Sequence, residues 1–181
     1  RAIEVSKDDR TEFVKPLQFI TDKPVMYVCN VDEDAAVSGN DYVEKVKGMV
    51  ANEKAEVLVL AVGTEADITE LETYDERQMF LEDLGLSEPG SAKLIRSAYK
   101  LLDLETYFTA GEKEVRAWTI PIGATAPQAA GVIHTDFEKG FIRAETIAYD
   151  AFIDCGGENG AKDAGKMRLE GKEYIVADGD V

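Results

Sequence analysis

The sequence lacks the features that mark membrane proteins and disulfide-rich secreted proteins. It contains no run of about 18 or more apolar residues, which a membrane-spanning helix requires, and no signal peptide opens it. Only two of its 181 residues are cysteines, Cys29 and Cys155, too few for a disulfide framework. We therefore expect a cytoplasmic protein with two unpaired thiols and no membrane partner.

Basic residues are also scarce. The chain has 20 Lys and Arg against 36 Asp and Glu, a formal net charge of −16. A phosphate backbone attracts lysine and arginine, so this balance disfavours sequence-blind binding to nucleic acid, and we expect no recognition of DNA sequences. Any contact with RNA has to come from one face. The best local group of cations in the second half is Arg116, Lys139 and Arg143.

The motifs of phosphate chemistry and metal binding are missing as well. A Walker A loop reads G-x-x-x-x-G-K-[ST], and no segment matches it. The nearest glycine-rich stretch, residues 156–166, lacks this spacing and a buried strand before it, so we predict a surface loop. His134 is the only histidine and has no Cys/His cluster around it. We therefore predict no catalytic residue and no metal site, with binding as the alternative role for His134.

Between residues 23 and 84, runs of apolar residues indicate the secondary structure. Buried-strand runs at 25–29 and 56–62 flank a helical pattern that follows Asn40, a good N-cap residue. A second helical stretch then continues to residue 84, with a break near Tyr74. Two apolar strands joined by a crossover helix are typical of a parallel sheet in an α/β fold.

The pattern of apolar residues and turn residues differs on both sides of this region. Residues 1–22 have the spacing of the last turns of an amphipathic helix. Residues 85–90 form a linker before a short helix capped by Ser91. A hairpin, a short helix capped by Thr125, a glycine-punctuated loop and further strands then follow, with strands expected at 106–109, 114–120, 141–147 and near the end of the chain. This order indicates an α+β plan of the ubiquitin or β-grasp kind.

Asn30 ends the first strand, and ligands of open parallel sheets bind beyond the carboxyl ends of the strands. Its amide offers an acceptor and donors that match the adenine edge, where N7 accepts and the 6-amino group donates. Guanine-binding GTPases carry Asn-Lys-x-Asp at this place, whereas this chain reads Asn30-Val31-Asp32-Glu33. The missing lysine and the longer acid favour adenine. By pattern alone, an asparagine after a strand is also a common turn residue.

Three stretches of the sequence are similar to those of a known family: KPVMYVCNVDE, the run from ETYFTAGEKEVRAWTIPIG to FIRAETIAYDAFI, and GAKDAGKMRLEGKEYIVADGDV. Through them, nearly the whole chain resembles the YchF family of Obg-like ATPases. The resemblance implies a partial P-loop NTPase-type parallel sheet followed by a β-grasp TGS domain. Residues 1–22 would end a helical insert, residues 23–84 would complete the nucleotide-binding domain, and residues 85–181 would be a linker helix and the TGS domain.

The resemblance also implies a nucleotide site. Asn30 would read the base edge, Val31 and Glu33 would shape the pocket, and a second loop would contribute Val62 and Gly63. The full-length parent would bind and hydrolyse ATP, or GTP, with Mg²⁺. This chain, which lacks the phosphate and magnesium motifs, would be inactive alone and hold no nucleotide tightly.

The implied partners are adenine nucleotide and the ribosome. Candidate contacts to RNA or protein in the second domain are Arg116, His134, Lys139 and Arg143. The alternative function is a stand-alone β-grasp module that recruits a protein without dependence on nucleotide.

Overall fold

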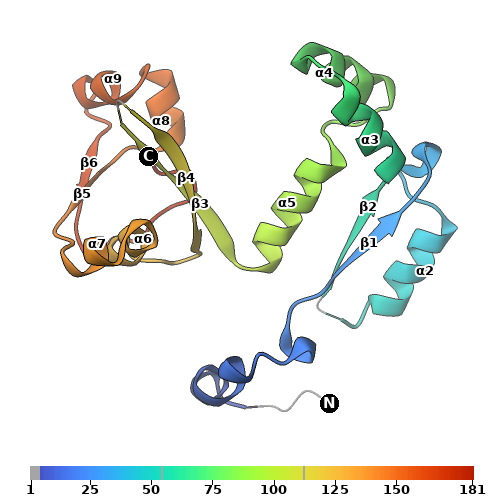
Figure 1. Cartoon of the computed structure of the whole chain (residues 1–181), viewed down its shortest axis with the longest axis horizontal. Helices are drawn as coiled ribbons and strands as arrows, with labels where there is room; N and C mark the ends of the chain where they lie inside the picture. Colours follow the sequence, from blue (N-terminus) through green and yellow to red (C-terminus); the bar gives the residue numbers. More distant parts are fainter. Residues whose placement is uncertain (1–4, 54, 112) are drawn as a thin grey trace. The chain divides into compact units, whose positions relative to one another are not determined.

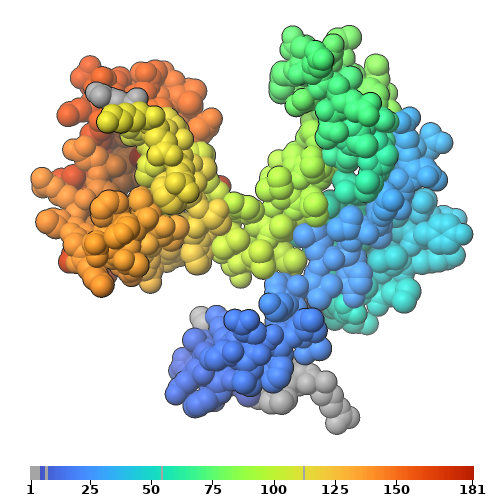
Figure 2. All heavy atoms as spheres, in the orientation of Figure 1, coloured from blue at the N-terminus to red at the C-terminus, as the bar shows by residue number. Residues whose placement is uncertain are grey.

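The computed structural model describes residues 5–53, 55–111 and 113–181. The chain divides into two compact units, Arg1–Leu101 and Leu102–Val181, whose elements are labelled in Figure 1 and whose atoms are drawn in Figure 2. In the described part of the chain, no helix has the length and apolarity that crossing a membrane would require. Both cysteines are free thiols.

The first unit is built on two parallel strands. Strands β1 (Met26–Asn30) and β2 (Glu56–Leu60) pair in register from Met26 opposite Glu56 to Asn30 opposite Leu60. Helix α2 (Asp41–Val50) connects them, and α3 (Val62–Glu70) and α4 (Tyr74–Asp83) follow β2 (Figure 1). The predicted parallel pairing with a crossover helix is confirmed. Val62 differs from the prediction, because it begins α3 instead of ending the strand.

Local capping chemistry places the helices of this unit. Asn40 Oδ1 accepts hydrogen bonds from the N–H groups of Tyr42 and Val43, at 3.0 and 3.1 Å, and so starts α2 as predicted. A capping box between Thr73 and Glu76 starts α4, which explains the break expected near Tyr74. Helix α5 (Gly90–Leu101) begins one residue before its predicted cap and packs on β2.

The amphipathic helix expected over residues 1–22 is wrong for the described residues, and residues 1–4 lie outside them. The segment instead consists of four short helical pieces: α1 (Lys7–Asp9), the π-turn η1 (Arg10–Val14), and the 3₁₀ turns η2 (Lys15–Leu17) and η3 (Ile20–Asp22). Pro16 cannot donate a helical hydrogen bond. Gln18 has a left-handed backbone, with φ at +49°, which ends the helical run.

The second unit contains an antiparallel hairpin of β3 (Leu104–Ala110) and β4 (Val115–Pro121), with Leu104 opposite Pro121. Helix α6 (Ala126–Ile133) packs on it around a core that includes Tyr107, Ile120 and Ala129. A second antiparallel pair follows, β5 (Ala144–Thr146) with β6 (Arg168–Glu170). The hairpin was predicted correctly, although β3 is longer than expected at both ends and β4 begins and ends one residue later than expected.

Three short helices complete the second unit: α7 (Thr135–Lys139), α8 (Tyr149–Asp154) and α9 (Glu158–Asp163) (Figure 1). Two expectations for this region are corrected. The glycine-rich stretch 156–166 contains α9, because Gly156, Gly157 and Gly165 supply the positive φ angles that turn the chain on either side of a short helix. The strand expected at 141–147 is limited to residues 144–146.

The last residues of the chain connect the β3–β4 hairpin to the β5–β6 pair, although they form no regular strand. Phe108 N–H donates to the Asp180 carbonyl and Gly179 N–H donates to the Thr106 carbonyl, both at 2.7 Å. On the other side, Ile147 and Val181 exchange two hydrogen bonds of 2.8 Å. Residues 179–181 therefore lie between β3 and the residue that follows β5. The turn predicted at residues 178 and 179 is present, with φ of Gly179 at +81°.

Glu105 of β3 is an ionisable group in an unfavourable place. Its Oε1 is buried and finds no hydrogen-bond partner among the described residues. Burial raises the pKa of the Glu105 carboxyl, and the charges of Asp178 and Asp180 add to this, while a hydrogen bond from the Gly123 N–H opposes it. Because the folded state holds this proton more tightly than the unfolded chain, the ionised carboxylate destabilises the second unit at neutral pH.

Replacing Glu105 by Gln should therefore stabilise the protein at pH 7, because the neutral amide removes a partly buried negative charge near Asp178 and Asp180. The gain should shrink as pH falls through the raised pKa and should vanish below the ordinary carboxyl range. Denaturant unfolding at several pH values measures this, with the exposed Glu173→Gln as the matched control. A pH-independent gain would contradict the assignment.

Candidate functional site

The carboxyl ends of β1 and β2 are tied together by two hydrogen bonds. Val31 N–H donates to the Leu60 carbonyl at 2.9 Å, which extends the parallel ladder by one bond. Val62 N–H, the first of α3, donates to the Asn30 side-chain Oδ1 at 3.0 Å. Asn30 therefore satisfies one of the open N–H groups at the start of α3, although it comes from the neighbouring strand.

This bond defines which part of the Asn30 amide is available to a ligand. One lone pair of Oδ1 is used by Val62, and the amide NH₂ has no partner among the residues that the structure describes. Asn30 is exposed at the sheet edge. A free NH₂ group matches N7 of a purine. Because adenine and guanine both present N7, an amide NH₂ donor fits either purine, and Asn30 alone does not separate the two bases.

Four of the five residues predicted for the nucleotide site meet at this edge. Asn30, Val31 and Val62 are joined through the bonds just described, and Gly63 is the next residue of α3. A side chain built on Gly63 would meet nothing within 4 Å, so there is open space beside it. Glu33 lies in the 3₁₀ turn η4 (Glu33–Ala35) and is exposed. The edge thus places an amide donor beside an exposed glycine.

Two substitutions at Asn30 separate its structural role from its donor. Asn30→Ala should lower the free energy of unfolding by about 1 kcal/mol, the usual cost of losing a cap. Asn30→Asp keeps an oxygen for Val62 N–H and adds a favourable charge at the start of α3, so its stability should match the parent. Denaturant unfolding tests both. Equal losses in the two variants would show that the Val62 bond does not matter.

The candidate contact residues of the second unit divide between two places. Arg116 lies on β4, with its guanidinium carbon 4.1 Å from the Trp118 ring centre. His134, Lys139 and Arg143 belong to α7 and its two flanks. His134 begins α7, because its Nδ1 accepts a hydrogen bond from the Asp136 N–H at 3.2 Å. The structure thus assigns His134 a capping role that leaves most of its ring exposed.

Sequence reasoning missed two apolar side chains beside these cations. Phe137 is 55% exposed and Ile142 is 79% exposed. Together with Arg143 they line a shallow hollow of about 440 Å³ between α6, α7 and the following loop. The His134 ring lies 5.9 Å from the Phe137 ring. Phe137 and Ile142 could have been found from the sequence, because they lie within eight positions of His134. We name Phe137, Lys139, Ile142 and Arg143 the α7 surface.

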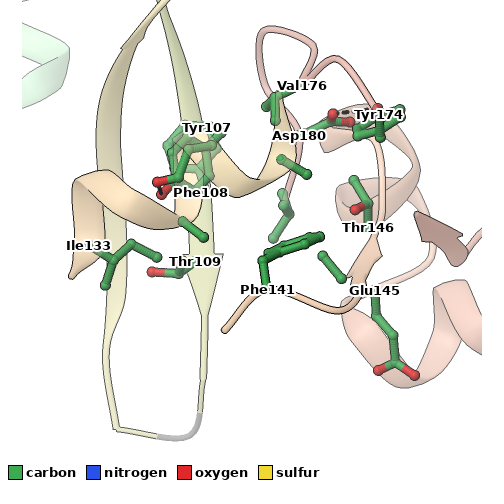
Figure 3. A pocket seen from close by; sticks show the side chains of 15 residues that line it. Tyr107, Phe108, Thr109, Ile133, Phe141, Glu145, Thr146, Tyr174, Val176 and Asp180 are labelled. Carbon is green, nitrogen blue, oxygen red and sulfur yellow. Dashed lines mark hydrogen bonds between the residues drawn. The ribbon is translucent and has the colours of Figure 1, made fainter. Parts of the chain in front are cut away.

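A separate cavity of about 170 Å³ lies inside the second unit, between β3, α6 and the end of the chain (Figure 3). Tyr107 O–H donates to the Ala129 carbonyl at 2.9 Å, and Tyr174 O–H donates to Asp180 at 2.6 Å. Burial raises the pKa of both tyrosines to about 12, with the Asp180 charge adding to the shift of Tyr174. Both phenols therefore stay protonated at neutral pH and serve packing.

No cluster of three or more His, Cys, Asp or Glu side chains among the described residues is arranged to hold a metal ion. The two candidate sites are therefore the strand edge at Asn30 and, independently of it, the α7 surface.

Comparisons with known proteins agree with the resemblance noted in the sequence. A family model described as "YchF-GTPase_C: Protein of unknown function (DUF933)" matches residues 104–181. The chain is 56% identical to the "Ribosome-binding ATPase YchF" of Escherichia coli O157:H7 and 54% identical to that of Bacillus subtilis, in both cases over the whole chain. It is 44% identical to "Obg-like ATPase 1" of Rattus norvegicus, over 96% of the chain.

A solved structure, that of the Schizosaccharomyces pombe YchF GTPase, superimposes on the whole chain with a TM-score of 0.84 at 37% identity. The chain belongs to the YchF family of Obg-like ATPases and corresponds to their C-terminal part. It spans about half of its relatives, covering 49% of the Escherichia coli protein, 44% of the rat protein and 48% of the fission-yeast chain.

Proposed function

We propose that this chain supplies the base-recognition edge and the partner-binding domain of a ribosome-associated ATPase. Residues 1–22 would end the helical insert, residues 23–84 would complete the nucleotide-binding domain, and residues 85–181 would form the linker helix and TGS domain. The observation that carries the proposal is the Asn30 amide, which is exposed at the carboxyl edge of a parallel pair and held there by Val62 N–H at 3.0 Å.

The nucleotide half of the proposal rests on chemical fit. The free NH₂ of Asn30 suits purine N7, and the open space beside Gly63 leaves room for the ring. The described residues supply no glycine-rich cradle for the phosphates and no ligand cluster for Mg²⁺. Binding and hydrolysis of ATP, or of GTP, with Mg²⁺ are accordingly proposed for the full-length cytoplasmic protein, and this chain contributes recognition of the base.

Asn30→Asp in the full-length protein tests this step. The substitution replaces the NH₂ donor by an oxygen that repels N7, and ATP binding should weaken by about 1–3 kcal/mol, roughly 5- to 150-fold. Asn40→Asp is the matched control, because it makes the same chemical change at a helix cap away from the sheet edge. Isothermal titration gives both affinities. Unchanged ATP affinity in Asn30→Asp would remove the base-recognition role.

The strand arrangement of the second unit supports a β-grasp TGS domain. The hydrogen bonds give the order β4, β3, residues 179–181, then β5 and β6, with α6 packed on the β3–β4 hairpin. A hairpin followed by a helix, with the last segment inserted beside the first strand, is the plan expected from the sequence. Its α7 surface combines two cations with two exposed apolar side chains, a composition suited to a ribosomal partner.

Reversing the two cations of the α7 surface should weaken this association. We expect the double variant Lys139→Glu with Arg143→Glu to bind ribosomes less tightly at every salt concentration. If the partner is RNA, the salt dependence should also fall by about one unit per lost phosphate contact. Co-sedimentation with ribosomes measures this, and exposed Lys172→Glu serves as the control. Equal binding by all variants would exclude the α7 surface.

The second candidate function is a protein-recruiting module that does not depend on nucleotide. The exposure of Phe137 and Ile142 favours it, because apolar side chains grouped on a surface mark docking sites for protein. The two candidates differ in one result: a recruiting module should bind its partner equally well with and without ATP in the full-length protein.

A further inference from the structure

The amino end of α5 is held by a carboxylate that belongs to α3. Glu65 Oε1 accepts a hydrogen bond from the Gly90 N–H at 2.6 Å, and Glu65 Oε2 accepts one from the Ser91 N–H at 3.0 Å. Both oxygens of one side chain are therefore engaged by the first two N–H groups of a twelve-residue helix. The negative charge also interacts favourably with the positive end of the helix dipole.

Gly90 allows this close approach. It is buried, and a side chain at this position would collide with Leu60 Cδ1 and lie 3.0 Å from Glu65 Oε1. Its φ is not among the positive glycine angles, so the glycine is needed here for space. Helix α5 therefore starts directly against Leu60, the last residue of β2.

The same two elements form the candidate base site. The Leu60 carbonyl accepts the hydrogen bond from Val31 N–H, and the first N–H of α3 donates to Asn30. Glu65 lies in the first turn of α3, where its own N–H donates to the Ala61 carbonyl at 3.0 Å. Thr64 and Ile68, buried at 3% and 5% exposure, fix α3 against the rest of the unit. The base loop and the start of α5 thus share the end of β2 and the first turn of α3.

The connection from helix α5 to the first strand of the second unit is short. It ends at Leu101, and β3 begins at Leu104. Asp103 between them has a left-handed backbone, with φ at +52°, and its carbonyl accepts a hydrogen bond from Ile122 N–H at 2.8 Å. Two residues therefore separate the end of α5 from the start of β3.

We propose that Glu65 is a positioning residue that couples occupancy of the base site to the docking of α5 within the first unit. The inference rests on the proposed nucleotide function. A purine at Asn30 restrains the start of α3, which restrains Glu65, which in turn restrains Gly90 and Ser91. Because coupling between two binding sites is reciprocal, a ligand of the second unit that alters α5 docking must alter nucleotide affinity by the same factor.

Hydrogen–deuterium exchange on the full-length protein, with and without saturating ATP, tests the coupling. In the unmodified protein, ATP should slow exchange at residues 30–35 and also at residues 90–93, by about fivefold or more at the second place. Glu65→Gln keeps the shape of the side chain and removes its charge and one acceptor. This variant should retain the response at 30–35 and lose it at 90–93.

Two further variants sharpen the test. Glu70→Gln makes the same chemical change at an exposed position of α3 and should respond to ATP as the unmodified protein does. Gly90→Ala keeps the Glu65 carboxylate but places a methyl group against Leu60 Cδ1 and Glu65 Oε1, so it should weaken the contact with Glu65 and reduce the response at 90–93. A variant that only loosens the fold would speed exchange at 90–93 equally with and without ATP, and the difference between the two conditions excludes that reading.

The outcomes separate the two proposals. Protection at 30–35 without any response at 90–93 in the unmodified protein would overturn the coupling and leave the nucleotide site intact. A full response at 90–93 in Glu65→Gln would overturn the role of Glu65. Absence of ATP protection at residues 30–35 would remove the nucleotide function, and the coupling with it.

Discussion

The first unit depends on the parallel pairing of β1 with β2, which brings the ends of two strands that are 30 residues apart in sequence to one edge. One consequence is the hydrogen bond from Val62 N–H to Asn30 Oδ1, which makes an asparagine of one strand the cap of the helix that follows the other. The bond also orients the remaining NH₂ of the amide outward. The oxygen of this side chain thus serves the fold, and its NH₂ group is the part that the proposed base recognition would use.

The same edge explains how a base site could influence a distant part of the chain. Leu60 and the first turn of α3 contact the base loop on one side and the start of α5 on the other. The contacts consist of backbone hydrogen bonds, a buried glycine and a carboxylate with both oxygens engaged, and none of them involves a long exposed side chain. Packed elements of this kind transmit displacements instead of absorbing them.

The acidic balance of the chain makes the location of its cations meaningful. Lys139 and Arg143 lie near Phe137 and Ile142 around α7, while Arg116 lies on β4 over Trp118. Two cations therefore lie close together in a chain whose net charge is −16, although Asp136 and Glu138 belong to the same helix. In the interior of the same unit, the polar groups of Tyr107 and Tyr174 are engaged in hydrogen bonds, and both phenols stay protonated at neutral pH.

The predictions succeeded where local chemistry decides the structure. Apolar runs and the cap at Asn40 predicted the β-α-β order, and the family resemblance is confirmed by relatives that match the whole chain. They failed where local signals compete. Apolar spacing suggested a helix in residues 1–22, but Pro16 and Gln18 interrupt it. Glycines suggested an irregular loop at 156–166, but they flank a helix at 158–163.

The sequence by itself determined the β-α-β elements of the first unit, their parallel pairing and the position of Asn30 at the sheet edge, because apolar periodicity and capping act over a few residues. Only the tertiary structure decided that Val62 N–H uses the Asn30 oxygen, that Glu65 holds the start of α5, and that residues 179–181 join β3 to the end of β5. Each of these contacts joins residues that are at least 25 positions apart in the sequence, and those between β3 and the end of the chain are more than 70 positions apart. Such contacts depend on how the helices and strands pack against one another, and a local sequence pattern does not predict this packing.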